Sequence, residues 1–206
     1  MRIGVPKEIK VHEGRVSLIP PAVSELVRNG HEVFIQSGAG IASGYPDEDY
    51  RQVGAQILPD AATLYGSTQM VLKVKEPIPS EYGLLRQDHI LFSYLHLAAT
   101  PRLAQVLVEK GLTAVAFETV EANGKLPLLA PMSDIAGRLA IHIGTTLLHS
   151  PAGGRGVMLG GLPSTERGHV VILGAGVAGG NAAAVAAALG ARVTVFAPRR
   201  EELERM

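Results

Sequence analysis

Residues 169–196 read HVVILGAGVAGGNAAAVAAALGARVTVF, and this stretch decides the fold of the C-terminal part of the chain. The β-branched runs His169–Leu173 and Arg192–Phe196 predict two buried strands. Between them, Gly180–Leu189 predicts a helix because it is rich in alanine, the best helix former. The glycines between the first strand and this helix predict a tight turn. The stretch is therefore expected to form a β-α-β unit with two parallel strands.

The glycine turn follows the pattern G-x-G-x-x-G at Gly174, Gly176 and Gly179. Gly174 permits the tight turn, Gly176 lets the backbone approach a pyrophosphate, and Gly179 lets the helix pack closely on the strand. The free N–H groups and the dipole of the helix N-terminus favour an anion at this point. Because a strand precedes the turn and a helix follows it, the context predicts a dinucleotide site. The alternative is a glycine-rich turn without a ligand.

The end of the second strand departs from the usual dinucleotide pattern. An acidic residue normally stands there and binds the ribose 2′-hydroxyl of NAD, but this chain has Ala197. Arg199 or Arg200 could instead contact a 2′-phosphate, which would favour NADP. Alternatively, the two arginines are solvated charges at the start of a helix. The residues alone therefore leave the choice between NAD and NADP open.

The first 120 residues alternate short apolar runs with helical patterns, joined by short links. Such alternation predicts a mostly parallel sheet with helices on both faces. The expected fold class is α/β, with a Rossmann-like doubly wound domain followed by an incomplete Rossmann dinucleotide-binding domain. Strand candidates are Arg2–Val5, Glu32–Gln36, Ala55–Leu58, Met70–Val74, Ile90–Leu95 and Thr113–Glu118. Helix candidates are Pro20–Asn29, Asp47–Val53, Ala61–Tyr65, Ser80–Arg86 and Pro101–Lys110.

The composition excludes several classes of function. Nineteen basic and 19 acidic residues cancel, so neither nucleic acid nor an anionic membrane is an expected partner. The chain has no cysteine, which excludes disulfides, thiolate metal sites and a cysteine nucleophile, and no metal site is expected. The apolar stretch Ile135–Leu148 contains Arg138 and His142 and is shorter than the ~20 residues of a membrane span. We expect a soluble, cytoplasmic protein that acts on a small molecule.

Lys73 and Lys75 alternate with apolar residues at the C-terminal end of the predicted strand Met70–Val74. At strand period both side chains would lie on one face, at the edge where open α/β sheets bind ligands. A buried lysine needs an anionic partner, and a substrate carboxylate or carbonyl would be suitable. The alternative is an ammonium group that simply reaches solvent. This alternative is favoured for Lys73 but not for Lys75.

His96 ends the following predicted strand and would share a face with Tyr94. An imidazole can exchange a proton near neutral pH, which suits acid–base catalysis, although a lone histidine is more often structural. The possible proximity of Lys75 favours the catalytic interpretation.

Arg15 follows the first predicted strand of the same sheet and could hold a carboxylate in bidentate fashion. Taken alone, Arg15 is better explained by an ion pair with Glu13 or Glu8. Together with Lys75 and His96, however, it would come from three strands to one sheet edge. Such a group could hold a small 2-oxo or 2-amino acid and move a proton, and the nucleotide turn then implies hydride transfer.

The domain organisation follows from these segments. We expect a substrate-binding domain at residues 1–130, a connecting helix at 131–150 and a partial nucleotide-binding domain at 151–206. Ser133 or Asp134 could be the N-cap of the connecting helix. A single β-α-β unit cannot complete a doubly wound sheet. We therefore expect a truncated chain with exposed apolar surface on its last unit.

Several motifs, in this order, resemble the bacterial alanine dehydrogenases. The resemblance covers nearly the whole chain and includes motifs specific to that family. The motifs are Ile3–Glu8, Arg15-Val16, Val74–Pro77, Tyr94–Ala98, Pro131–Arg138, Gly153–Gly161 and the glycine turn.

The resemblance implies reversible oxidative deamination of L-alanine to pyruvate and ammonium with NAD, by a homo-oligomer that is typically a hexamer. It implies that Arg15 and Lys75 bind the substrate carboxylate and carbonyl, with Lys75 also taking part in catalysis, and that His96 is the general acid/base. It further implies cofactor contacts by Ser133, Val177 and Ala178 beside the three glycines.

The chain departs from the family pattern at two places. The ribose-binding aspartate of the family falls on Ala197, and its catalytic aspartate lies beyond Met206. We therefore expect the 206-residue chain to be inactive alone. Two alternatives stay open: the alpha subunit of a proton-translocating transhydrogenase, and a non-catalytic fragment that only binds ligand or associates with itself.

Overall fold

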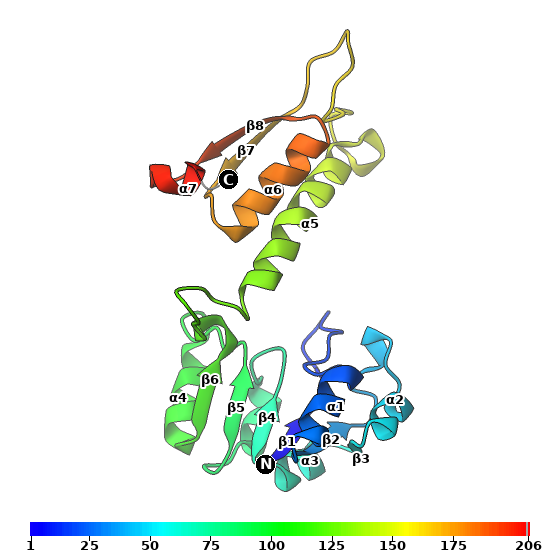
Figure 1. Ribbon diagram of the computed structural model, residues 1–206, viewed down its shortest axis with the longest axis vertical. Coiled ribbons are helices and arrows are strands. Elements are labelled where there is room, and N and C mark those ends of the chain that lie inside the picture. The colour runs from blue at the N-terminus through cyan, green and yellow to red at the C-terminus, as the bar shows by residue number, and fades with distance from the viewer. Residues whose placement is uncertain (205) are drawn as a thin grey trace. The chain divides into compact units, whose positions relative to one another are not determined.

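The computed structural model describes residues 1–204 and 206. The chain divides into two compact units, Met1–Val120 and Glu121–Met206 (Figure 1). The long helix that the sequence predicts as a connector packs within the second unit. The expected boundaries at residues 130 and 150 stay a prediction.

The first unit contains a six-stranded parallel sheet with the order β3-β2-β1-β4-β5-β6. The chain starts in the middle of the sheet at β1, moves to one edge at β3, and then continues from β4 to the other edge. This is the doubly wound order that the sequence predicts, and its direction switches between β1 and β4. The strands are β1 (Arg2–Val5), β2 (Glu32–Gln36), β3 (Gln56–Leu58), β4 (Met70–Leu72), β5 (Ile90–Ser93) and β6 (Thr113–Ala116).

Helices cover both faces of this sheet, because strand side chains alternate between two cores. In β2, Val33 and Ile35 pack in the core with α1 and α2, whereas Phe34 packs in the core with α3 and α4. The helices are α1 (Pro20–Arg28), α2 (Asp47–Gln52), α3 (Ala61–Ser67) and α4 (Pro101–Lys110), with 3₁₀ segments η1 (Ile41–Ser43), η2 (Pro79–Leu84) and η3 (Phe117–Thr119).

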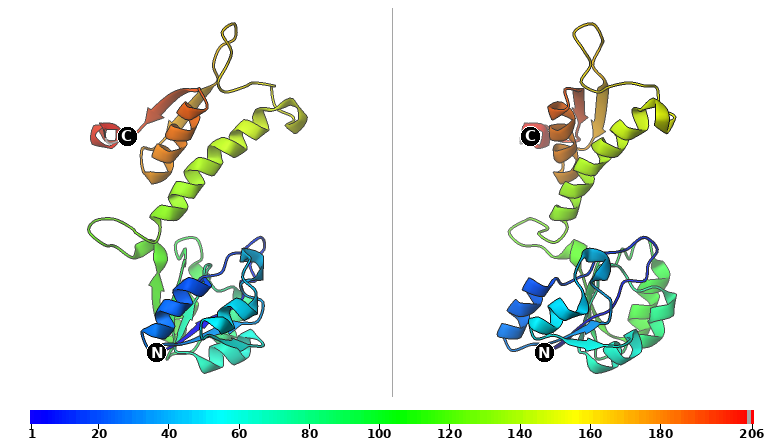
Figure 2. Two further views of the ribbon diagram at one scale, coloured as in Figure 1. Left: turned by 45° about the vertical axis from the view of Figure 1, so that its right-hand side comes forward. Right: turned by 90° about the vertical axis from the view of Figure 1, so that its right-hand side faces the viewer.

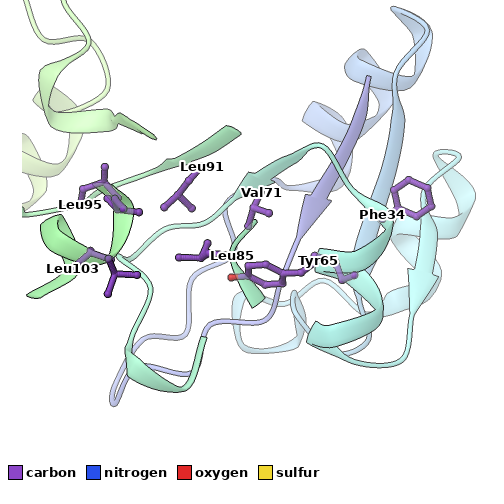
Figure 3. Close-up of a cluster of buried hydrophobic side chains, with 10 residues drawn as sticks. Phe34, Tyr65, Val71, Leu85, Leu91, Leu95 and Leu103 are labelled. Atoms are coloured by element: carbon purple, nitrogen blue, oxygen red, sulfur yellow. The ribbon is translucent and has the colours of Figure 1, made fainter. Parts of the chain in front are cut away.

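Figure 3 shows the core on the α3–α4 side of the sheet. Val71 and Leu91 come from the neighbouring strands β4 and β5, and Leu85 and the Tyr65 ring pack against them. All four side chains are almost fully buried. Truncating such an aliphatic side chain to alanine costs about 2–5 kcal/mol, so each of them contributes to the stability of the first unit.

Several predicted strands are shorter in the structure. Strand β4 ends at Leu72 and β5 at Ser93, because the chain bends away from the sheet at Val74 and after Tyr94. The segment predicted as a helix at residues 80–86 is the 3₁₀ segment η2. Helix α4 has the predicted bounds and ends at Gly111, whose positive φ of 67° suits a helix C-terminus.

The second unit contains the parallel pair β7 (His169–Leu173) and β8 (Arg192–Phe196), both with the predicted bounds. Helix α6 (Val177–Ala188) connects them, and α5 (Ala130–Leu148) runs alongside it (Figure 2). The short elements are η4 (Ser150–Ala152) and α7 (Arg200–Glu204).

Two helix starts in this unit differ from the prediction. Helix α6 begins at Val177 rather than Gly180, because its first turn already includes part of the glycine turn. Helix α5 begins at Ala130, with Leu129 as its N-cap, rather than at Ser133 or Asp134. Pro131 suits the first turn of a helix, and this explains the earlier start.

The small sheet has one covered face and one face with exposed apolar side chains. Ile172 packs in a core with Ile141 of α5 and the alanines of α6. On the opposite face, Leu173 is 84% exposed, and Val171 and Phe196 are also exposed. The predicted exposed apolar surface is therefore present. Within the described residues, no helix is both long and apolar enough to cross a bilayer.

Candidate functional site

The candidate substrate residues lie on three loops at one edge of the large sheet. Arg15 follows β1, Lys75 follows β4, and His96 follows β5. These three strands are consecutive in the sheet, and all are parallel. Because the winding direction switches between β1 and β4, the first two loops flank the point where open α/β sheets bind ligands.

Arg15 forms a bidentate ion pair with Glu13. Its Nε and Nη2 atoms lie 2.8 and 2.6 Å from the two oxygens of that carboxylate. These hydrogen bonds hold the pKa of Glu13 below its usual value, although burial acts in the opposite direction. The positive charge of Lys75 acts on the same carboxylate. The ion pair is the alternative that the sequence favours for Arg15 alone.

Tyr94 links the arginine to the histidine. Its ring centroid lies 6.1 Å from that of His96. Burial raises the pKa of Tyr94, and the nearby Arg15 guanidinium partly offsets this effect. The Tyr94 ring also packs edge-on against Phe117, with centroids 5.1 Å apart, and this contact fixes its orientation.

His96 has a left-handed backbone conformation with φ of 48°. This conformation is uncommon outside glycine and persists only where the surroundings impose it. Here the His96 N–H donates to Glu118 Oε1 at 2.7 Å, and the Thr100 hydroxyl donates to the His96 carbonyl at 2.9 Å. The loop therefore presents the imidazole, which is exposed, from a backbone that is fixed on both sides.

Glu76 provides a negative charge beside His96. Its Oε2 atom lies 3.5 Å from His96 Nδ1, and its other oxygen is paired with the Lys10 ammonium. Burial raises the pKa of Glu76, but the hydrogen bond from Lys10 and the charges of Lys10 and Lys75 together hold it below its usual value. The carboxylate is therefore ionised at neutral pH and can stabilise a protonated imidazole.

The two lysines after β4 have different environments. Lys73 is only 1% exposed, and its Nζ atom lies 2.8 Å from Glu81 and 3.3 Å from Glu8. The prediction that its ammonium reaches solvent is therefore wrong. Lys75 is half-buried and lies in the bend that follows the strand. Since β4 ends at Leu72, strand alternation does not extend to either lysine.

A hollow of about 160 Å³ lies beside Arg15. Charged groups form one part of its lining, and small or aliphatic residues from the loop after β2 form another. This size and mixed lining are suited to a small polar molecule. The lining residues are Lys7, Glu8, Glu13, Gly14, Arg15, Gly38, Ala39, Ile41 and Ala42.

The glycine turn of the second unit leaves space for a ligand. Among the described residues, none lies within 4 Å of the position of a Cβ on Gly174 or Gly176. A Cβ on Gly179, in contrast, would overlap the carbonyl oxygen of Gly174, so this position requires glycine. Val177 and Ala178 form the first turn of α6 and place backbone N–H groups at the turn. The arrangement fits the pyrophosphate of a dinucleotide.

Ser133 lies in the first turns of α5, one helical turn before Gly137. Gly137 abuts the carbonyl oxygen of Ala178. Because residues four apart share a helix face, Ser133 lies on the face of α5 that packs towards the glycine turn. This is the location that a cofactor contact by Ser133 requires.

The arginines after β8 are paired with carboxylates of α7, which begins at Arg200. Arg199 Nε donates to Glu202 at 2.8 Å, and Arg200 Nε donates to Glu204 at 2.9 Å. Both pairs have the spacing of exposed helix ion pairs. Ala197 lies between these arginines and the strand.

The sequence analysis missed three carboxylates of the first site. Glu8 and Glu76 each follow a lysine directly, in Lys7-Glu8 and Lys75-Glu76, and this adjacency near strand ends is a usable signal. Glu118 has no such local signal, because it contacts the His96 backbone across 22 residues of sequence.

These features define a Rossmann-type α/β protein with two units, a charged rim on the first and an open glycine turn on the second. The family described as "Alanine dehydrogenase/PNT, N-terminal domain" matches residues 4–136, and its C-terminal domain counterpart matches residues 140–206. The chain belongs to the alanine dehydrogenase/PNT family.

Several named proteins are similar to the chain. The alanine dehydrogenase of Bacillus subtilis (strain 168) is 50% identical over 206 residues, which are 100% of this chain and 54% of that protein. The alanine dehydrogenase of Mycobacterium tuberculosis (strain H37Rv) is 50% identical over 197 residues, which are 95% of this chain and 53% of that protein. The chain spans about half the length of these curated relatives.

Solved structures agree with this similarity. An L-alanine dehydrogenase superposes with a TM-score of 0.92 and 53% identity, covering 100% of this chain and 57% of the other. A transhydrogenase from Sinorhizobium meliloti superposes with a TM-score of 0.83 and 24% identity, covering 100% and 59%. The second similarity shows the shared fold alone.

Proposed function

We propose that the protein is an L-alanine dehydrogenase, which reversibly converts L-alanine, NAD⁺ and water to pyruvate, ammonium, NADH and a proton. Family membership and the named relatives support the activity of the whole protein. The single observation that carries the proposal is the presence of Arg15, Lys75 and His96 on three adjacent loops at the switch point of the sheet.

The first unit would bind and orient the substrate. The planar guanidinium group of Arg15 would bind the substrate carboxylate, which would replace part of the ion pair between Arg15 and Glu13. Lys75 would donate to the carbonyl oxygen of pyruvate and stabilise the charge that develops there. His96 would move the proton of the water that adds to or leaves C2, with Glu76 stabilising the protonated imidazole.

The second unit would bind NAD at the glycine turn, with Gly174, Gly176 and Gly179 in the backbone turn and Ser133, Val177 and Ala178 beside it. When bound, NAD accepts the hydride from C2 of the substrate. We favour NAD over NADP because Arg199 and Arg200 are engaged by Glu202 and Glu204. We further propose that the complete protein is a cytoplasmic homo-oligomer, with a hexamer as the arrangement that the family resemblance implies, and that its partners are small molecules.

Pyruvate binding to the 206-residue chain tests the substrate site directly. We expect Arg15→Lys or Lys75→Met to weaken pyruvate binding about 10-fold or more in calorimetric titrations, because each removes a charge-assisted contact. The control is Lys110→Met at the end of α4, which should bind pyruvate as the unchanged chain does. Pyruvate binding that is absent, or that neither variant weakens, would contradict the proposed substrate site.

Turnover is a separate measurement. We expect no alanine-dependent NADH formation by the 206-residue chain, because it spans about half the length of its relatives. In a full-length protein, Lys75→Ala should abolish alanine turnover, whereas a transhydrogenase would tolerate this change. Alanine-dependent NADH formation by the short chain would show that the expectation of inactivity is wrong.

A further inference from the structure

A cluster of charged side chains is buried behind the candidate substrate site. It consists of Glu8, Lys73 and Glu81, whose side chains are each almost fully enclosed, together with the hydroxyl of Tyr65. Lys73 Nζ lies between the two carboxylates, 2.8 Å from Glu81 and 3.3 Å from Glu8. Burying ions is unfavourable unless they are paired and hydrogen-bonded. The hydrogen bonds that the two carboxylates accept therefore indicate the role of the cluster.

Glu81 holds the segment η2. Its Oε2 atom accepts the Ile78 N–H at 2.9 Å, and Oε1 accepts the Tyr65 hydroxyl at 3.2 Å. These contacts fix the start of η2 against α3 and do not involve the loop that carries Lys75. The Glu81 end of the cluster is therefore structural.

Glu8 holds the bend that carries Lys75. Its Oε1 atom accepts the Val74 N–H at 2.6 Å and lies 3.4 Å from the Lys75 N–H. The regular pairing of β1 with β4 ends at Gly4 and Val71. Beyond that point, the Glu8 carboxylate takes the place of a strand carbonyl and accepts the backbone N–H groups of the bend.

The other side of the bend is fixed by the chain that continues β5. The Lys73 N–H donates to the Phe92 carbonyl at 3.1 Å, and the Tyr94 N–H donates to the Val74 carbonyl at 3.2 Å. The backbone of residues 73–75 is thus held on both sides, by backbone groups on one side and by a single carboxylate on the other.

The charge of that carboxylate depends on Lys73. Burial raises the pKa of Glu8 by more than the Lys73 charge and the N–H donors lower it. Without Lys73, burial would favour the protonated carboxyl group, which is a weaker acceptor for backbone N–H groups.

We propose that Glu8, held in place by Lys73, is a positioning residue that sets the direction of the Lys75 side chain by fixing the backbone that carries it. The inference rests on the proposed function of Lys75 as a substrate ligand. Glu8 lines the same hollow as Arg15 and Glu13, so the residue that fixes the Lys75 backbone lies at the candidate substrate site. It acts through the backbone of Lys75 and needs no contact with the substrate.

The test is the rate at which the Lys75 amine of the 206-residue chain is acetylated by limiting N-acetoxysuccinimide, measured by mass spectrometry of the peptides. In Glu8→Gln, we expect the rate at Lys75 to rise about 3-fold or more, because the bend is released and the side chain gains exposure. Lys110, which is also half-buried and lies in the same unit, is the internal reference and should keep its rate. Glu48→Gln, an exposed change in α2, is the control variant.

A second variant guards against loss of folding. Glu8→Met leaves Lys73 paired with Glu81 at 2.8 Å, so that no buried charge loses its only partner. It should give the same faster acetylation of Lys75. In the unchanged chain, saturating pyruvate should slow the acetylation of Lys75, and in both variants this protection should need about 10-fold more pyruvate.

The outcomes separate the two proposals. If the rate at Lys75 is unchanged in both folded variants, or rises equally at Lys110, Glu8 is not a positioning residue. If pyruvate fails to protect Lys75 in the unchanged chain while the variants still accelerate its acetylation, the positioning role holds and the substrate role of Lys75 does not.

Discussion

Gly137 of α5 lies against the carbonyl oxygen of Ala178 in α6, so closely that a Cβ at position 137 would overlap this oxygen. The missing side chain lets the two helices approach at the level of the glycine turn. Because Gly137 has no Cβ, α5 packs closely on α6, and this contact fixes the position of Ser133 relative to the first turn of α6.

Substitution of Gly137 by alanine tests this close approach. We expect Gly137→Ala to lower the free energy of unfolding of the second unit by about 1–3 kcal/mol, because overpacking forces the helices apart. NADH binding should weaken in parallel, since the displaced contact lies at the glycine turn. Urea denaturation followed by circular dichroism and fluorescence titration with NADH measure the two effects.

Gly144 is the matched control on the same helix. In the described part of the chain, nothing lies within 4 Å of the position of its Cβ. Gly144→Ala should therefore stabilise the unit by about 0.5–1 kcal/mol through helix propensity alone. A Gly137→Ala protein as stable as Gly144→Ala would contradict the role assigned to the contact.

The proximity of Glu76 to His96 predicts an effect on the imidazole. An ionised carboxylate 3.5 Å from Nδ1 favours the tautomer that carries its proton on that nitrogen. Glu76→Ala should shift the neutral ring towards the form protonated at Nε2, and long-range ¹H–¹⁵N spectra in mildly alkaline solution report this ratio. Glu109→Ala, an exposed change on α4, should leave the ratio unaltered. If the tautomer ratio is the same in the unchanged chain, in Glu76→Ala and in Glu109→Ala, Glu76 does not control the tautomer of His96.

The ion pair of Glu13 with Arg15 predicts a pH dependence. Hydrogen bonds from Arg15 hold the pKa of Glu13 below its usual value. The folded state therefore favours the ionised form, and the stabilisation is present above the usual pKa and is lost as the pH falls through the lowered one. Glu13→Gln should reduce the free energy of unfolding of the first unit at pH 7 by no more than ~1 kcal/mol, because the Arg15 side chain is 48% exposed.

The difference between the unchanged chain and Glu13→Gln should shrink on acidification and approach zero below the lowered pKa of Glu13. Urea unfolding curves at several pH values measure it. A difference that grows towards low pH would show that the carboxylate is not stabilised by Arg15.

Position 197 predicts a change in cofactor affinity. A carboxylate after the second strand can accept hydrogen bonds from the ribose hydroxyls of NADH but repels the 2′-phosphate of NADPH. Ala197→Asp should raise NADH affinity about 10-fold without improving NADPH binding. Arg200→Gln serves as the control and should leave the preference unchanged, because Arg200 already pairs with Glu204. If Arg200→Gln abolished NADPH binding, the arginine would be a phosphate ligand.

The parts of the fold that the sequence predicts well have local signals at their ends. Strands β7 and β8 have the predicted bounds because Gly168 and Gly174 flank the first apolar run, and Gly190 precedes and Pro198 follows the second. Helix α4 starts at Pro101 and ends before Gly111. The pairing of Arg15 with Glu13 is also local, since only one residue separates the two side chains.

The parts that could not be predicted depend on contacts between distant segments. Lys73 is buried because Glu8 and Glu81 enclose it, and Glu8 is 65 positions away in the sequence. A pattern of alternating residues cannot reveal such a partner. The end of β4 at Leu72 has the same origin, because on the β1 side the bend after it is held by the Glu8 side chain rather than by pairing with β1.

The open face of the small sheet has a consequence for handling the molecule. An apolar patch formed by Leu173, Val171 and Phe196 is exposed to water. Attraction between such areas strengthens on warming and in kosmotropic salts, so concentrated solutions of the chain should turn turbid under either condition and clear again on cooling. Light scattering at several concentrations would measure this self-association, and ligand titrations are best made in dilute, cool solution.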